Sequence, residues 1–262
     1  MKNKINLTNY DYDNAVKLTY NKPNLKYPSF PNDNDLEIYE KQYNDYSYDS
    51  IHPLVAPIIE NVMNVDDFVN NDNVIMTSDF NFSTPLVLEK ELTINLNGKT
   101  ISSGVFSENN GVITEGNTDS YPFFVQKDGE LIIKGNGVVR SSDANYSMAV
   151  WAKGGKVKIY GGKFYNAGDG CDLIYASNEG DVEIYGGEFH ATERSGEVPG
   201  TKNKFSALNL KDNSNSRIVV YGGKFYGFNP SDNLSEGPNT NFVADGYKSV
   251  EVEPNVWEVL EK

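Results

Sequence analysis

The feature that most constrains the fold of this sequence is a short motif that occurs three times. A tyrosine, two glycines, a charged residue and a phenylalanine follow one another at 160–164, 185–189 and 221–225, and an imperfect copy lies at 134–139. Successive copies start 26, 25 and 36 residues apart. A period near 25 residues with one insertion is typical of a solenoid, in which each repeat packs on its neighbours.

Each of the three full copies follows a segment in which alternate residues are apolar. These segments are 157–159, 182–184 and 218–220, and a period of two predicts a strand with one buried face. The glycine pair then turns the chain, because glycine adopts positive φ at no steric cost. A second strand is expected earlier in each repeat. These expected strands are 123–126, 149–152, 173–176 and 207–210.

Three phenylalanines hold the same position just after the glycine turn, namely Phe164, Phe189 and Phe225. Stacked in register, they predict an aromatic ladder inside a single core. The repeats therefore predict an all-β fold, a parallel β-helix, over residues 73–262. A β-sandwich of short hairpins is the alternative. However, hairpins do not require the same motif to recur three times at the same position after a strand.

Residues 1–52 differ from the rest of the chain. They are rich in Asn, Asp and Tyr, they show no helical or strand period, and Pro23, Pro28 and Pro31 interrupt any helix. Because tyrosine is enriched at interfaces, we expect an extended arm that anchors the protein to a partner. A disordered tail is the alternative. The candidate partner-binding residues are Tyr10, Tyr12, Tyr20, Tyr27, Tyr39, Tyr43, Tyr46 and Tyr48.

A brief helical pattern occupies residues 53–72, between the arm and the repeats. Leu54, Ile58 and Val62 recur on one helical face, and Val65 and Phe68 continue the pattern after a break. The open first strand edges of a β-helix favour aggregation unless they are covered. We therefore expect a short helix that caps the first repeat or serves in oligomerisation.

The charge and the reactive residues exclude several classes of function. Asp and Glu outnumber Lys and Arg by 37 to 23, and the net charge of −14 disfavours nucleic acid and anionic membranes as partners. Cys171 is the single cysteine, and His52 and His190 are the only histidines, so no intrachain disulfide and no His/Cys zinc site form. We expect no metal and no cofactor. We also expect no secretory signal and no transmembrane span, because the sequence lacks a long apolar run.

The run 92–101 and the later glycine-turn repeats resemble the right-handed, single-stranded parallel β-helix proteins of the pectate-lyase-like family. The resemblance covers roughly residues 65–260. With the arm and the segment 241–259, the chain looks most similar to head-fibre or spike proteins of crAss-like gut phages. This resemblance implies a homotrimeric virion protein, assembled in the host cytoplasm, bound to capsid or tail proteins and in contact with host or mucus glycans. Two alternatives are a tail-spike polysaccharide depolymerase and a bacterial surface carbohydrate-binding β-helix.

The catalytic patterns of that family are not found in this sequence. Arginine is scarce, with Arg140, Arg194 and Arg217 as the only three, and His190 is not followed by glycine. We assign no catalytic residue and favour a non-enzymatic protein. The depolymerase alternative depends on loop carboxylates that alignment on the glycine turn places in one row, although acidic residues are also common in solvated turns. These carboxylates are Asp143, Asp169, Glu193 and Asp232.

The tyrosines of the repeated motif are candidate contacts for a glycan or a neighbouring subunit. Tyr160, Tyr185 and Tyr221 are expected in a row at the outer edge of the strands, and Trp151 is expected to extend this surface. Exposed aromatic rows serve both kinds of contact, because the rings offer a large apolar area with a polar end.

Overall fold

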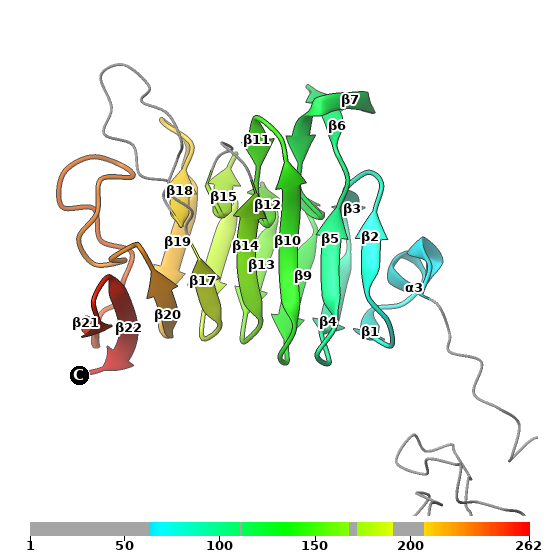
Figure 1. The fold of residues 1–262 in the computed structure, drawn as a ribbon. Coiled ribbons are helices and arrows are strands. Elements are labelled where there is room, and N and C mark those ends of the chain that lie inside the picture. The colour runs from blue at the N-terminus through cyan, green and yellow to red at the C-terminus, as the bar shows by residue number, and fades with distance from the viewer. Residues whose placement is uncertain (1–62, 111, 168–171, 191–206) are drawn as a thin grey trace, which may run out of the picture. The chain divides into compact units, whose positions relative to one another are not determined.

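Four β-sheets and one short helix make up the described part of the chain (Figure 1). The computed structural model describes residues 63–110, 112–167, 172–190 and 207–262. The expected arm over 1–52, with its eight tyrosines, lies outside the described residues. Most strand pairs are parallel, so the expected all-β class is confirmed, and the stacked parallel sheets are compatible with a β-helix.

Sheet A contains six parallel strands in the order β1-β4-β9-β13-β16-β19. Three of them, β13, β16 and β19, contain the segments that the alternating pattern before each glycine turn predicted as strands. The six strands are β1 (Asn73–Ile75), β4 (Glu91–Asn95), β9 (Glu130–Lys134), β13 (Lys156–Ile159), β16 (Asp181–Ile184) and β19 (Arg217–Val220).

Sheet B contains eight strands in the order β2-β5-β10-β14-β17-β20-β22-β21. The first six pair in parallel, and β22 adds to β20 in antiparallel orientation. The strands are β2 (Phe80–Phe82), β5 (Thr100–Ser103), β10 (Val138–Asp143), β14 (Lys163–Ala167), β17 (Glu188–His190), β20 (Gly223–Tyr226), β21 (Tyr247–Glu253) and β22 (Val256–Glu261).

Sheet C contains five parallel strands in the order β18-β15-β12-β8-β3, and the first four match, within one residue, the strands expected earlier in each repeat. Each repeat gives one strand to each of sheets A, B and C. For example, β12, β13 and β14 follow one another in sequence and belong to sheets C, A and B. The strands of sheet C are β3 (Leu86–Leu88), β8 (Phe123–Gln126), β12 (Val150–Lys153), β15 (Ile174–Ser177) and β18 (Leu208–Leu210).

The small sheet D departs from the repeat pattern. It has the order β11-β7-β6, with β6 (Phe106–Asn109) and β7 (Val112–Ser120) forming an antiparallel hairpin beside β11 (Tyr146–Ser147). This hairpin and the β21–β22 hairpin at the C-terminus were not predicted. An alternating pattern is the same in parallel and antiparallel strands, so it reveals the buried face and not the partner.

The predicted phenylalanine ladder is confirmed. Phe164, Phe189 and Phe225 are fully buried and pair in register across β14, β17 and β20. Their ring centroids are 5.0 Å and 4.7 Å apart, with interplanar angles of 6° and 12°. Val139 occupies the same register in β10, next to Phe164. This column packs into a core to which sheets A, B and C all contribute.

Both glycines of the repeated pair are required by the turn. Gly187 has a φ of 112°, which an L side chain rarely adopts. A Cβ on Gly186 would lie 2.8 Å from the carbonyl oxygen of Tyr160 in the preceding repeat. The pairs at 161–162 and 222–223 share both features. The glycines thus allow the corners of successive repeats to lie in direct contact.

The helix α3 (Val65–Val69) begins with a capping box between Asn64 and Asp67. Phe68 is buried and its ring lies 5.1 Å from that of Phe80 and 5.0 Å from that of Phe82. The described part of the expected 53–72 segment is thus helical over five residues, and it covers the first strands of the core. No helix among the described residues is long and apolar enough to cross a membrane.

Candidate functional site

A column of aromatic side chains lies on the outer face of sheet C. Phe124, Trp151 and Tyr175 occupy directly paired, outward positions of β8, β12 and β15. The ring centroids of Phe124 and Trp151 are 4.8 Å apart, and those of Trp151 and Tyr175 are 5.8 Å apart. Phe124 is buried, whereas the other two rings are partly exposed. The column therefore offers solvent an aromatic surface at its Trp151–Tyr175 end.

The β6–β7 hairpin covers the other end of this column. Phe106, Tyr121, Phe124 and Met148 form a second apolar cluster outside the main core, and Ile113 of the hairpin packs against it. The hairpin is thus held against the outer face of sheet C by apolar contacts, because the cluster contains residues of both elements.

A groove lies between the hairpin and the exposed aromatic rings, and we call it the aromatic groove. Its volume is about 690 Å³, within the range of small-molecule binding sites. Carboxylates, amides and two lysines surround the aromatic rings. The lining residues include Glu108, Thr118, Asp119, Tyr146, Trp151, Lys153, Asp172, Tyr175, Asn209 and Lys211.

Lys153 links the two walls of the aromatic groove. Its Nζ atom lies 3.3 Å from Oε1 of Glu108 in the hairpin and 5.0 Å from the ring centroid of Trp151. An ammonium over an indole face is attracted by the ring quadrupole. The indole Nε1 of Trp151 donates a hydrogen bond to Oγ of Ser177 at 2.8 Å. These contacts fix the tryptophan ring before any ligand binds.

Polar groups are also held in place around the rings. The Asp119 carboxylate is buried and accepts hydrogen bonds from the Glu108 amide at 3.1 Å and from Oγ1 of Thr118 at 2.5 Å. Asn209 Nδ2 donates to Oδ2 of Asp172 at 2.5 Å. The arrangement combines an apolar ring surface with ordered acceptors and donors, which suits a ligand that has both apolar faces and hydroxyl groups.

Beneath the hairpin, the Tyr121 hydroxyl is buried and has no hydrogen-bond partner among the described residues. Burial raises the pKa of this phenol well above its ordinary range, and the negative charges of Asp119 and Glu108 raise it further. Tyr121 is therefore neutral at every physiological pH. Its ring lies 5.3 Å from that of Trp151 and supports the indole from behind.

The predicted row of Tyr160, Tyr185 and Tyr221 is present, at the turn between sheets A and B. The ring centroids of Tyr160 and Tyr185 are 4.8 Å apart and those of Tyr185 and Tyr221 are 4.9 Å apart, all nearly parallel. Trp151 does not extend this row, because it lies on sheet C and contacts Tyr175 there. The contact role of the tyrosines stays a prediction.

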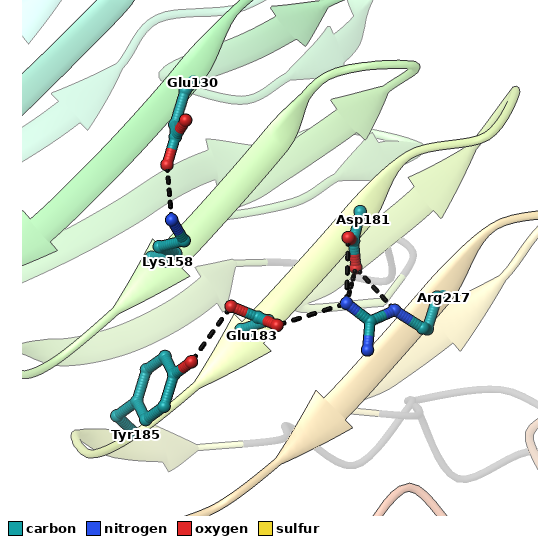
Figure 2. A network of polar contacts seen from close by, with 6 residues as sticks. All are labelled: Glu130, Lys158, Asp181, Glu183, Tyr185 and Arg217. Carbon is teal, nitrogen blue, oxygen red and sulfur yellow. Dashed lines mark hydrogen bonds and ion pairs between the residues drawn. The ribbon is translucent and has the colours of Figure 1, made fainter.

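The tyrosine row adjoins a network of ion pairs on sheet A (Figure 2). The Tyr185 hydroxyl donates to Glu183 at 2.9 Å, and Arg217 binds Glu183 at 3.1 Å and Asp181 at 2.9 Å. Burial, followed by the hydrogen bond to Glu183, raises the pKa of Tyr185 to about 12. The charges of this network pair with one another across adjacent strands, so this face presents little net charge.

The predicted acid row is only partly described. Asp143 ends β10 and Asp232 lies beyond β20, and both are exposed. The strands β14 and β17 separate β10 from β20, so these two carboxylates are not neighbours. Asp169 and Glu193 lie outside the described residues. Among the described residues, no three His, Cys, Asp or Glu side chains are grouped so that they can hold a metal ion.

Sequence reasoning missed the aromatic groove, although part of its signal was present. Trp151 and Tyr175 hold the same position in the expected strands 149–152 and 173–176, and Phe124 joins their column once the strand 123–126 is shifted by one residue. The hairpin residues that complete the groove gave no such signal, because they belong to an insertion that occurs in one repeat only. Comparison with protein-family models, curated proteins and solved structures found no match to this chain.

Proposed function

We propose that this protein binds glycans through the aromatic groove. The observation that carries the proposal is the exposed pair Trp151 and Tyr175, flanked by ordered carboxylates and amides. One face of a pyranose ring presents C–H groups that pack on an aromatic ring, while its hydroxyl groups bond to polar side chains. The Asp172–Asn209 pair lines the same groove and supplies such polar atoms.

The fold that we propose for the domain is a right-handed single-stranded parallel β-helix. One chain supplies one strand to each of sheets A, B and C in every repeat, which is the connectivity of a single-stranded helix. The right hand follows from strand twist, because parallel strands of one sheet joined by a crossover are almost always connected with that hand.

We further propose that the protein is a head fibre or spike of a bacteriophage particle, a homotrimer anchored to capsid or tail proteins by residues 1–52. The support is the likeness of the repeats and of the tyrosine-rich arm to such proteins, together with the acidic charge of −14. Mass spectrometry of purified particles tests this placement. Absence of the protein from the particles contradicts it and leaves the glycan-binding proposal standing.

The glycan-binding proposal is tested with Trp151→Ala and Tyr175→Ala on a glycan array. Each substitution removes one side of the aromatic surface, so we expect affinity to fall by about tenfold or more for any glycan that binds. Trp257→Ala is the matched control, because Trp257 is also a partly exposed tryptophan but belongs to β22 of sheet B and does not line the aromatic groove. Equal binding by the Trp151 variant and the wild type contradicts the proposal.

A polysaccharide depolymerase is the second candidate, favoured by the three carboxylates Glu108, Asp119 and Asp172 in the same groove. Hydrolysis of a glycosidic bond typically uses two carboxyl groups, one of them protonated. Incubation of a bound glycan with the protein distinguishes the two functions. New reducing ends or unsaturated products, lost in Asp119→Asn, establish a depolymerase, and an unchanged glycan establishes binding alone.

A further inference from the structure

A second groove lies on the outer face of sheet B, where β2, β5, β10 and β14 run side by side (Figure 1). Its volume is about 580 Å³. Three strand pairs place Asn81, Ser102, Arg140 and Tyr165 in one outward column along this groove. We call it the arginine groove. It belongs to a different sheet from the aromatic groove and shares none of its lining residues.

Among the described residues, Arg140 is the only charged side chain that lines the arginine groove. It is exposed and forms no ion pair with any described residue, whereas Arg217 on sheet A binds both Asp181 and Glu183. Two carboxylates lie at the ends of the strands that form the groove: Asp79, just before β2, accepts a hydrogen bond from the Thr100 amide, and Asp143 is exposed at the end of β10. In a chain with a net charge of −14, an arginine without a carboxylate partner is available for an external anion.

Neighbouring side chains add neutral donors and an aromatic surface. Oδ1 of Asn81 accepts a hydrogen bond from Oγ of Ser102 at 2.9 Å, which leaves the Asn81 amide nitrogen directed to other acceptors. The Tyr165 ring stacks on His190 with centroids 4.4 Å apart. In the column, Tyr165 lies between His190 and Arg140, so its second face is turned toward the arginine.

We propose that the arginine groove binds a sugar ring that carries an anionic substituent. The guanidinium of Arg140 pairs with the anionic group, because its planar donors match the oxygens of a carboxylate or of a sulfate ester. Asn81 and Ser102 bond to the ring hydroxyl groups, and the apolar face of the sugar packs on Tyr165. The site is thus separate from the aromatic groove and selects charged sugars.

Calorimetric titration of the full chain with methyl glucuronide, glucose 6-sulfate and methyl glucoside tests this proposal. Arg140→Gln removes the guanidinium, and Lys134→Gln is the matched control, since it makes the same change in net charge at an exposed residue of sheet A. We expect the charged sugars to bind the wild type and the control. We expect Arg140→Gln to weaken their binding roughly tenfold to a hundredfold, as loss of a charged hydrogen-bonding group does. The two charged sugars distinguish a carboxylate from a sulfate ester as the preferred group.

A second readout does not depend on the Arg140 variant. In the wild-type protein, NMR signals of the Tyr165 and His190 rings are expected to shift on addition of a charged sugar and to remain unchanged with methyl glucoside. Trp151→Ala is expected to leave these shifts intact, so failure here is distinct from failure at the aromatic groove. Equal affinity of Arg140→Gln and the wild type, or the absence of ring shifts with both charged sugars, overturns the proposal.

Discussion

Aromatic stacking has a different consequence at each position of the repeat. Phe189 lies between two parallel rings in the core and is fully buried, whereas Tyr185 lies between two parallel rings at the surface. The registers are identical, since the same parallel pairing aligns like residues in successive repeats. Burial therefore determines how much each residue contributes to stability.

Phe189→Ala is expected to lower the free energy of unfolding by about 3–5 kcal/mol, because it leaves a cavity between two rings that the column cannot fill. Tyr185→Ala, which removes a ring of similar size from a surface row, is the control and is expected to cost much less. Urea unfolding followed by circular dichroism measures both. Equal losses for the two variants contradict the packing described here.

His190 is the one histidine among the described residues. Burial lowers its pKa below the ordinary value of 6.5, and the carboxylate of Glu188, 3.6 Å away, opposes this shift. The unfolded chain therefore binds a proton more readily than the folded chain. The contribution of His190 to stability is complete above pH 6.5 and is lost as the pH falls from there through the folded pKa.

An NMR titration checks this expectation, with His52→Gln used to assign the two histidine signals. The His190 signal is expected to titrate below pH 6.5. Glu188→Gln is expected to lower the pKa further, because it removes the charge that favours the protonated ring. A pKa at or above the ordinary value contradicts the role given to burial.

At the scale of the element, the glycine turns decide whether one repeat can lie on the next. A Cβ on Gly222 would lie 2.4 Å from the carbonyl oxygen of Tyr185, and no flexible side chain is available to move away. The backbone of Gly222 does not adopt positive φ, so only the close contact opposes a larger residue.

Gly222→Ala is therefore expected to destabilise the protein by about 1–3 kcal/mol, as overpacking does. Gly104→Ala is the matched control: its backbone is also ordinary, and its Cβ would lie 3.4 Å from the nearest atom, the carbonyl oxygen of Ser83. The control is expected to remain as stable as the wild type. Thermal unfolding measures both variants, and a Gly222 variant that melts like the control contradicts the close approach of the repeats.

Elements that repeat were predictable from the sequence, and elements that occur once were not. Copies of the same motif predicted three features of one repeat: the strand of 182–184, the turn at Gly186 and Gly187, and the position of Phe189. The hairpin over 106–120 has no second copy, and neither alternation nor composition shows which strand it pairs with. The wall of the aromatic groove that the hairpin forms therefore could not be predicted from the sequence.

At the scale of the molecule, an element outside the repeats lies at each end of sheet B. Helix α3 places Phe68 against the first strands of sheet B, and β22 pairs with β20 in antiparallel orientation at the other end. Free strand edges are sites of aggregation, so these two elements protect the core. The charged side chains of β21, including Lys248 and Glu251, face solvent beyond it.

Deletion of residues 1–52 is expected to leave this domain folded, because the helix cap and the core described above lie between Met63 and Lys262. The truncated protein is expected to keep its β-rich circular dichroism spectrum and to melt within a few degrees of the full chain. A truncated protein without a cooperative transition contradicts this expectation. In particles, the same deletion is expected to abolish incorporation, in keeping with the anchoring role proposed for the arm.

Because successive glycine turns have the same geometry, a whole repeat can be removed without disturbing the turns on either side. Removal of residues 160–184 joins Ile159 to Tyr185 and deletes one strand from each of sheets A, B and C. The phenylalanine column then continues from Val139 to Phe189, and each repeat strand next to the deletion gains a new parallel neighbour in its own sheet. Loss or gain of a whole repeat can therefore shorten or lengthen the stack in steps of about 4.8 Å, one strand spacing, without a new core having to arise.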